Sequence, residues 1–354
     1  MSSRRIGVLI VDDSAFIRKA MKRMLGSDPA IKVVGEARDG YEAIQMVKGL
    51  NPDVVTLDVK MPDMDGLQAL ERIMREHPVP VLMVSSLTSE GGAVTLKALE
   101  MGAVDFIDKS SCHTAMDIAD IAASLIQKVK VIAGVDLKKV VESMPEHRPV
   151  SPATPSALSA TRDESPALLV AIGTSTGGPM SLEKVLTPLP ANFPGTILVV
   201  QHMPLGFTGS LAQRMNNQCP MEVKEAEEDD PLCPGRIYIA PSGYHLKLRR
   251  SLNRYHVVLS KEPRDMPHCP SVDVMMESIA QTWHGRMMGV VMTGMGHDGS
   301  EGVKAMKQRG GTILAQNEET CVVYGMPRAA YLTGCVDRML PLYEIANAIC
   351  LFAR

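Results

Sequence analysis

The first 120 residues alternate short apolar runs with stretches in which apolar positions recur every three or four residues. The short runs predict strands, and the longer spacing predicts helices. The predicted strands cover residues 6–11, 32–36, 54–57, 79–84 and 104–107. The predicted helices cover residues 15–25, 40–49, 66–76 and 92–101, and a further helix follows at roughly 114–133. This alternation is typical of a parallel sheet with helices on both faces.

The pattern stops at about residue 142 and resumes after Pro166, with prolines scattered among Ser, Ala and Thr between these points. Such composition predicts an interdomain linker. Beyond it we expect strands at 168–172, 196–200, 236–239, 245–248, 256–259, 288–292 and 312–315. Helices are expected at 180–186, 206–217, 272–283, 299–309 and 327–332. We therefore predict two α/β domains, at 4–122 and 166–354, joined by a connecting helix and a Pro/Ser/Ala-rich linker at 123–165.

Composition narrows the class of protein. The length of 354 residues suits two domains, and the net charge of −3 comes without a Lys/Arg cluster, which argues against a nucleic-acid partner. No apolar stretch approaches the roughly 18 residues of a membrane span, and the apolar run after Arg5 is too short for a signal peptide. The seven cysteines are scattered without a C-x-x-C pair, as expected of free thiols. We expect a cytoplasmic protein that is not membrane-embedded.

Carboxylates follow two strands of the first domain. Asp12 and Asp13 come directly after the first strand, and Asp58 ends the third. If the strand order is 2-1-3-4-5, these strands are neighbours and their carboxyl ends form a ligand-binding crevice; a receiver protein is one of the known examples of this rule. Three converging carboxylates repel one another unless a hard cation such as Mg²⁺ lies among them.

A hydroxyl and an ammonium group are predicted at the same edge of the sheet. Ser85 ends the fourth strand and Lys109 follows the fifth, where both side chains can hold phosphoryl oxygens. Taken singly, each polar residue is better explained as a solvated loop side chain or a helix cap. Five of them at the ends of the predicted strands favour a phosphate-accepting site.

The first domain resembles the receiver domains of response regulators over residues 4 to about 122. The segments that carry the resemblance are Val11-Asp-Asp-Ser14, Leu57-Asp-Val-Lys-Met-Pro62-Asp-Met-Asp-Gly66, Ser85 and Phe106-Ile-Asp-Lys109. The resemblance implies a flavodoxin-like fold in which Asp58 accepts phosphate from a histidine kinase. It also implies that Asp12, Asp13 and Asp58 serve Mg²⁺, that Ser85 and Lys109 contact the phosphoryl group, and that Phe106 is the switch aromatic.

Two glycine-rich loops stand out in the second domain. Gly173-Thr-Ser175-Thr-Gly177 has the G-x-S-x-G spacing of a nucleophile elbow, although a turn with a capping Ser or Thr is the more common explanation of so short a pattern. The loop from Gly294 to Gly299 reads G-x-G-x-x-G before a helix, which is also typical of dinucleotide binding. Against dinucleotide binding, the loop comes late in its domain, and its Asp298 would repel a pyrophosphate.

A serine nucleophile needs a general base, and three histidines near predicted strands are candidates. His202 follows the strand at 196–200, His245 lies near a turn, and His297 adjoins Asp298. A strand end beside the elbow favours His202 modestly. The residues alone leave the choice open.

From about residue 166 onward, the chain resembles the catalytic domain of the chemotaxis protein-glutamate methylesterases, the CheB family. The matching segments are Ala171-Ile-Gly-Thr-Ser-Thr-Gly-Gly178, Val200-Gln-His-Met-Pro204, Pro270-Ser-Val-Asp273, Met292-Thr-Gly-Met-Gly-His-Asp-Gly299 and Tyr324-Gly-Met-Pro-Arg328. Thr174, where we expect Ala, and His297 depart from the family pattern.

This resemblance implies a methylesterase domain with a doubly wound, mostly parallel sheet. Ser175 is implied as nucleophile, His202 as base and Asp298 as orienting carboxylate, with the backbone N–H groups of Thr176 and Met295 forming the oxyanion hole. The implied activity is phosphorylation-activated hydrolysis of glutamate γ-methyl esters on chemoreceptors, which releases methanol, and deamidation of receptor glutamines. No cofactor is implied for hydrolysis. A response regulator whose second domain only binds a partner or DNA, and a nucleotide-dependent oxidoreductase, are the alternatives.

Overall fold

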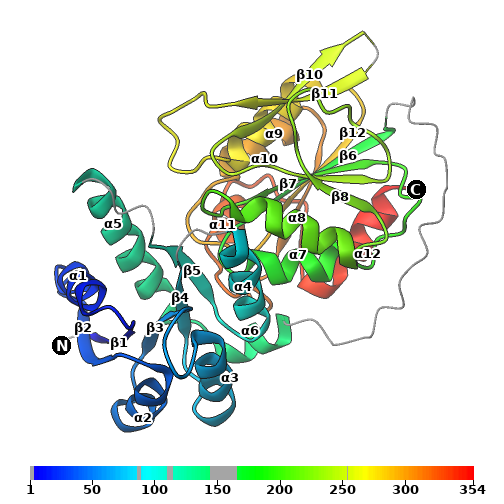
Figure 1. Ribbon diagram of the computed structural model, residues 1–354. Helices are drawn as coiled ribbons and strands as arrows, with labels where there is room; N and C mark the ends of the chain where they lie inside the picture. Colours follow the sequence, from blue (N-terminus) through cyan, green and yellow to red (C-terminus); the bar gives the residue numbers. More distant parts are fainter. Residues whose placement is uncertain (1–3, 86–88, 110–114, 144–165, 253) are drawn as a thin grey trace. The chain divides into compact units, whose positions relative to one another are not determined.

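The computed structural model describes residues 4–85, 89–109, 115–143, 166–252 and 254–354 (Figure 1). The chain divides into two compact units, of which the first includes the helix that ends at Ser143 and the second the strand that begins at Leu168. Each unit has its own sheet and its own buried core.

The first unit is built on a five-stranded sheet in the order β2-β1-β3-β4-β5, and every neighbouring pair of strands is parallel. This order is the one on which the predicted convergence of carboxylates depended. The strands are β1 (Ile6–Val11), β2 (Ile31–Ala37), β3 (Val54–Asp58), β4 (Val81–Ser85) and β5 (Asp105–Asp108). The helices are α1 (Ala15–Leu25), α2 (Gly40–Leu50), α3 (Gly66–Glu76), α4 (Ser89–Glu100), α5 (Ala115–Ile132) and α6 (Leu137–Ser143).

Local sequence explains where the helices of this unit begin. The Ser14 hydroxyl accepts from the backbone N–H of Ile17 at the start of α1, and the Asp39 carboxylate caps α2 in the same way. Asp65 and Gln68 form a reciprocal capping box at the start of α3. Asp65 therefore begins the helix that follows Asp58, and its carboxylate serves the backbone.

The helix α5 packs within the first unit rather than outside it. Its Leu125, Val129 and Ile132 are buried, and α5 contacts α1, β4 and β5. The predicted domain end at residue 122 therefore falls inside a helix whose apolar face completes the core. The linker that we predicted from prolines lies largely at residues 144–165, outside the described residues.

The second unit contains a seven-stranded, fully parallel sheet in the order β14-β13-β12-β6-β7-β9-β8 and a separate antiparallel hairpin, β10–β11. The strands are β6 (Leu168–Thr174), β7 (Thr196–Gln201), β8 (Glu222–Glu225), β9 (Arg236–Ile239), β10 (His245–Ser251), β11 (Arg254–Ser260), β12 (Arg286–Val291), β13 (Thr312–Gln316) and β14 (Arg338–Leu340). The helices are α7 (Gly178–Leu186), α8 (Phe207–Gln218), α9 (Val272–Thr282), α10 (Ser300–Gln308), α11 (Met326–Leu332) and α12 (Leu342–Phe352).

Helices cover both faces of this sheet. In Figure 1, α7, α8 and α12 lie on one face, and α9 and α10 lie on the other with α11 beside α10. The first strand of the unit, β6, lies in the middle of the sheet. On one side of it lie β7, β9 and β8 in that order, and on the other lie β12, β13 and β14. The strand order reverses between β6 and β12, which is where open α/β sheets bind their ligands.

Three elements of the second unit were absent from the sequence expectations. The strand β8 is short and mostly polar, β14 has only three residues, and both form by pairing at an edge of the sheet. The helix α12 carried a readable signal, because its buried Leu342, Ile345, Ala346 and Ile349 have helical spacing. These side chains face α7.

Within the described residues, none of the helices combines the length and the apolar character needed to cross a membrane. The six cysteines in these ranges are all free thiols.

Gly66 sets the tight return of the chain after Asp58. A Cβ atom at this position would lie 2.0 Å from the carbonyl oxygen of Asp58. We predict that Gly66→Ala lowers the free energy of unfolding of the receiver unit by about 2–3 kcal/mol, since backbone must move to make room. Hydrogen exchange of the β1 and β3 amides measures this free energy.

The control is Gly49→Ala in α2, where an added Cβ meets nothing within 4 Å. Removing glycine from a helix there stabilises by up to about 1 kcal/mol. Equal effects of the two substitutions would contradict the proposed steric role of Gly66.

Candidate functional site

The three carboxylates predicted at the edge of the receiver sheet do lie together. Asp12 and Asp58 are buried at the ends of β1 and β3, whereas Asp13 is exposed. One carboxylate oxygen from each lies within 4.8 Å of the others. The crevice therefore combines two desolvated acids with a third that faces solvent.

Lys109 brings a positive charge into this crevice. Its Nζ atom lies 2.6 Å from Asp58 Oδ2 and 3.1 Å from Asp12 Oδ2. The backbone of Lys109 is also fixed, because its N–H donates to the carbonyl of Ser85 at the end of β4. Ser85 is buried at this edge, so the structure brings all five predicted polar residues to one end of the sheet.

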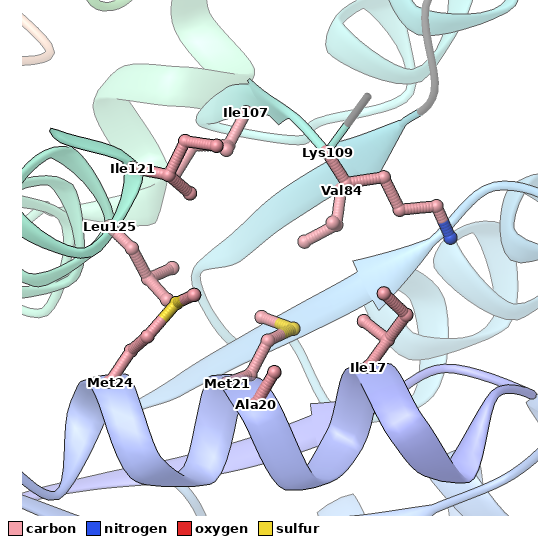
Figure 2. Close-up of a pocket in the computed structure, with 9 residues that line it drawn as sticks. All are labelled: Ile17, Ala20, Met21, Met24, Val84, Ile107, Lys109, Ile121 and Leu125. Carbon is pink, nitrogen blue, oxygen red and sulfur yellow. The ribbon is translucent and has the colours of Figure 1, made fainter. Parts of the chain in front are cut away.

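An apolar cavity of about 40 Å³ beside Lys109 explains how its side chain is supported. Figure 2 shows the Lys109 ammonium pointing away from this cavity, while its chain runs along one wall. An aliphatic stem on an apolar wall with the charge at a polar edge is the usual arrangement for a partly buried lysine. The other lining residues are Ile17, Ala20, Met21, Met24, Val84, Ile107, Ile121 and Leu125.

Burial and charge oppose each other in this crevice. Burial raises the pKa of Asp58, and Lys109 only partly offsets this effect. Burial alone would lower the pKa of Lys109, but the hydrogen bonds and charges of Asp58 and Asp12 raise it. The lysine therefore remains charged beside the acid.

The aromatic residue predicted as a switch, Phe106, is buried in β5. The Lys128 ammonium lies 6.0 Å from its ring centroid and 2.6 Å from the carboxylate of Asp105. The ring is thus enclosed beneath α5 in this conformation.

In the second unit, Ser175 follows β6 in a loop that several backbone contacts fix. Its N–H donates to the carbonyl of Thr293, and its own carbonyl accepts from Gly178 N–H and from Gln201 Nε2. Gly177 adopts a positive φ of 76° just before α7, which glycine permits. The serine remains half-exposed while the turn around it is buried.

His202 and Asp298 form a hydrogen-bonded pair from two different strand ends. His202 follows β7, and its Nε2 atom lies 2.8 Å from Asp298 Oδ2. In the parallel register of β6 and β7, Thr174 pairs with Gln201, so Ser175 and His202 are the next residues on neighbouring strands. His202 N–H also donates to the Thr174 carbonyl.

The tautomer of His202 follows from this pairing. A carboxylate only accepts, so the neutral ring carries its proton on Nε2 and a lone pair on Nδ1. Nδ1 is buried and has no hydrogen-bond partner among the described residues. A buried nitrogen acceptor without a partner is unusual in a protein interior and is the chemically available atom of this site.

The first turn of α9 holds the Asp298 carboxylate. Oδ1 accepts from the Ser271 hydroxyl and from Asp273 N–H, each at 2.9 Å, and Oδ2 accepts from Val272 N–H at 2.8 Å. Burial by itself would raise the pKa of Asp298, but the hydrogen bond and charge of His202 and these N–H groups hold it well below its usual range. The carboxylate stays ionised although it is buried.

Thr176 and Met295 lie on the two loops that meet at Ser175. The Thr176 carbonyl accepts from the Thr293 hydroxyl at 3.0 Å. Gly294, which precedes Met295, packs so closely that a Cβ atom there would lie 2.8 Å from Ser175 Cβ. Thr176 therefore follows the serine directly, and Met295 follows the glycine that packs against it; their role in an oxyanion hole stays a prediction.

Dinucleotide binding by the loop Gly294–Gly299 does not agree with its contacts. Gly294 N–H donates to Val323, and its carbonyl accepts from the N–H groups of Gly325 and Met326. The loop therefore turns its start toward Ser175 and residues 323–326, and places the carboxylate of Asp298 in the interior.

The two other histidines that were candidates for the general base, His245 and His297, lie in different surroundings. His245 is buried, with Nε2 near the Pro263 carbonyl and Nδ1 accepting from Ser271 N–H, so both ring nitrogens serve the backbone. Burial lowers its pKa. His297 is exposed.

Sequence reasoning missed Ser271 and His268 as parts of the site. The Ser271 hydroxyl caps α9 and binds Asp298, a role that the cap position after Pro270 could have suggested. The ring of His268 stacks on that of His202 with centroids 4.0 Å apart. No pattern in the sequence signals this contact.

The fold and geometry define a receiver unit followed by a doubly wound α/β unit with a Ser, His and Asp set at its topological switch point. The sequence matches the response regulator receiver domain over residues 8–119 and the CheB methylesterase family over residues 170–349. The chain belongs to the CheB methylesterase family, and the resemblance found from its motifs is confirmed.

Relatives match both halves together. The chain is 47% identical to protein-glutamate methylesterase/protein-glutamine glutaminase 2 of Nitratidesulfovibrio vulgaris, over 97% of this chain and 98% of that protein. It is 44% identical to protein-glutamate methylesterase/protein-glutamine glutaminase of Pyrococcus abyssi, over 99% and 94% respectively. The crystal structure of the Thermotoga maritima CheB methylesterase catalytic domain is 41% identical, with a TM-score of 0.51, and covers 52% of this chain and 98% of its own.

We predict that Ser271→Ala lowers the free energy of unfolding of the second unit by about 1–2 kcal/mol, because it removes a helix cap and a donor to a buried carboxylate. Ser300→Ala is the control, since the Ser300 hydroxyl donates to the exposed carbonyl of His297. Its effect should stay within about 0.5 kcal/mol. Hydrogen exchange of the β6 and β12 amides measures the free energy of unfolding of both variants. Equal decreases would contradict the proposed capping role of Ser271.

Proposed function

We propose that this protein is a phosphorylation-activated esterase that hydrolyses γ-methyl esters of glutamate residues in chemoreceptors and deamidates receptor glutamines. The observation that carries this proposal is the buried His202–Asp298 pair, with an unpartnered Nδ1, at the strand end next to Ser175. Support comes from the names of the relatives, which pair a methylesterase with a glutaminase activity.

The chemistry we propose begins with attack of Ser175 Oγ on the ester carbonyl carbon. His202 Nδ1 takes the hydroxyl proton as general base, and Asp298 stabilises the imidazolium that forms. The backbone N–H groups of Thr176 and Met295 stabilise the negative charge that develops on the carbonyl oxygen. The half-exposed serine is accessible to a side chain on another protein.

Collapse of the tetrahedral intermediate breaks the bond to the leaving group. The proton on His202 passes to methoxide, which leaves as methanol, or to the amide nitrogen, which leaves as ammonia. Water then attacks the acyl-enzyme with His202 as base, releasing the glutamate carboxylate and restoring Ser175. The same acyl-enzyme thus serves the ester and the amide, and none of these steps uses a cofactor.

In the receiver unit, Asp58 is the proposed acceptor of phosphate from a chemotaxis histidine kinase. Lys109 and Ser85 would contact the phosphoryl oxygens, and the buried Phe106 would change its position in response. The oxygen donors of Asp12, Asp13 and Asp58 fit Mg²⁺, which prefers carboxylates and water. When bound, this ion would neutralise charge on the transferred phosphoryl group.

Two further parts of the proposal concern location and partners. Free thiols at all six described cysteines favour a reducing compartment, and we propose the cytoplasm. The proposed partners are the chemoreceptor substrate and the kinase, with no role for nucleic acid.

We predict that Ser175→Ala lowers kcat for methanol release from methylated receptor membranes by roughly 10⁴–10⁶-fold, since the nucleophile is lost. Ser181→Ala is a matched control, because its buried hydroxyl donates to the Gly177 carbonyl on the same loop. That variant should keep most of the activity. Substantial methanol release by Ser175→Ala would favour another nucleophile or a role in binding only.

A second prediction concerns activation. A small phosphodonor with Mg²⁺ should accelerate methanol release by the wild-type protein, and Asp58→Asn should abolish the acceleration while basal release remains. Asp63→Asn is the control in the same loop, because Asp63 is exposed with a φ of 64° that Asn also adopts. An Asp58→Asn protein that still responds to the phosphodonor would place the phosphate elsewhere.

A further inference from the structure

The first turns of α9 and α10 each bind an aspartate that lies in, or just before, the start of the other helix. Asp298 lies directly before the α10 cap residue Gly299, and it accepts N–H groups from the first turn of α9. In return, Asp273 in the first turn of α9 accepts the N–H of Gly302 in the first turn of α10 at 2.7 Å. Both helix starts thereby satisfy N–H groups that lack partners inside their own helix.

We propose that Asp273 is a positioning residue that fixes Asp298, and through it the ring of His202, by locking the starts of α9 and α10 together. This inference rests on the proposed function, in which His202 must present Nδ1 to Ser175. The hydrogen bonds of Asp273 run to Asp298 and to Gly302, so its effect on His202 would pass through Asp298.

The two helix starts approach too closely to shift freely. A Cβ atom at Gly302 would lie 2.6 Å from Met276 Cβ and 3.2 Å from Asp273 Cα. A Cβ atom at Gly299 would lie 3.1 Å from a methyl carbon of Val272. The Gly302 N–H can therefore reach the Asp273 carboxyl group only while the present spacing of the helices is kept.

Charge adds a second element to this lock. The Asp273 N–H donates to the Asp298 carboxylate, so the two acidic groups lie close together. Burial raises the pKa of Asp273 to about 7, to which the charge of Asp298 contributes, while the N–H groups of Gly302 and Gly299 act against the rise. Since Asp298 is held ionised, Asp273 is the group of this pair that takes up a proton first as the pH falls.

A simpler explanation is that Asp273 is an acidic residue in the first turn of a helix, where it stabilises α9 by interacting with the helix dipole. That role would affect the free energy of unfolding and leave the chemical step unchanged. The two explanations therefore predict different kcat values for a variant that lacks the Asp273 side chain. They also differ in whether an uncharged side chain of the same shape can restore kcat.

The test compares Asp273→Ala and Asp273→Asn in the full-length protein. Asparagine keeps an oxygen for the Gly302 N–H without the negative charge, whereas alanine offers no acceptor. We expect Asp273→Ala to lower kcat for methanol release by about 10- to 100-fold with KM unchanged, the size of effect caused by a misplaced catalytic group. Asp273→Asn should retain most of the wild-type kcat.

The control variant is Asp337→Ala, which removes a carboxylate that is bound to the last turn of α10, at the far end of that helix from Asp273. Asp337 pairs with Lys307 of α10 and accepts the Ile313 N–H at 2.8 Å, at the amino end of β13 and away from the site. We expect this variant to lose stability, measured by hydrogen exchange, while kcat stays at the wild-type value.

Two outcomes would overturn the inference. In the first, Asp273→Ala keeps the wild-type kcat. In the second, Asp273→Asn loses as much kcat as Asp273→Ala, so that keeping the shape of the side chain and its acceptor oxygen does not preserve activity. Either result, with Ser175-dependent methanol release intact in the wild-type protein, would leave the proposed function standing. Loss of that wild-type activity would instead refute the proposed function itself.

Discussion

The buried carboxylate of Asp298 is the constraint on which the arrangement of the second unit depends. An ionised group in a protein interior is costly unless strong donors surround it. Here the Ser271 hydroxyl, two N–H groups of α9 and the His202 ring supply these donors. Satisfying one charge therefore fixes the start of α9, the loop before α10 and the orientation of the histidine.

The receiver unit also buries carboxylates, but it compensates their charge only in part. Its carboxylates are crowded at a sheet edge, and Lys109, which follows the edge strand β5, provides the compensating charge. Burial still raises the pKa of Asp58, so the crevice retains an unfavourable concentration of negative charge. A site in this condition gains stability from a cation or from neutralisation of the acid, which suits a switch. In contrast, the hydrolase site is fully compensated and suits a fixed catalytic geometry.

Much of this could be predicted from sequence because parallel strands bring their carboxyl ends to one edge. The positions of Asp12, Asp58 and Lys109 follow from strand ends and strand order alone. Ser175 and His202 follow equally from neighbouring strand ends, once β6 and β7 are known to pair.

Sequence could not choose among three histidines or recognise the G-x-G-x-x-G loop as part of a hydrolase site. That choice depends on the contact of Gly294 with Ser175 and on the cap that α9 places on Asp298. Both are contacts between segments far apart in the chain. The stacking of His268 on His202 is of the same kind.

The central claim is that His202, held by Asp298, activates Ser175. Labelling with a fluorophosphonate that reacts with activated serines, followed by mass spectrometry of the peptides, tests it most directly. The account predicts a single adduct on Ser175 that is absent from His202→Gln and forms far more slowly in Asp298→Asn. An adduct on another residue, or equal labelling of Ser175 in His202→Gln, would contradict it.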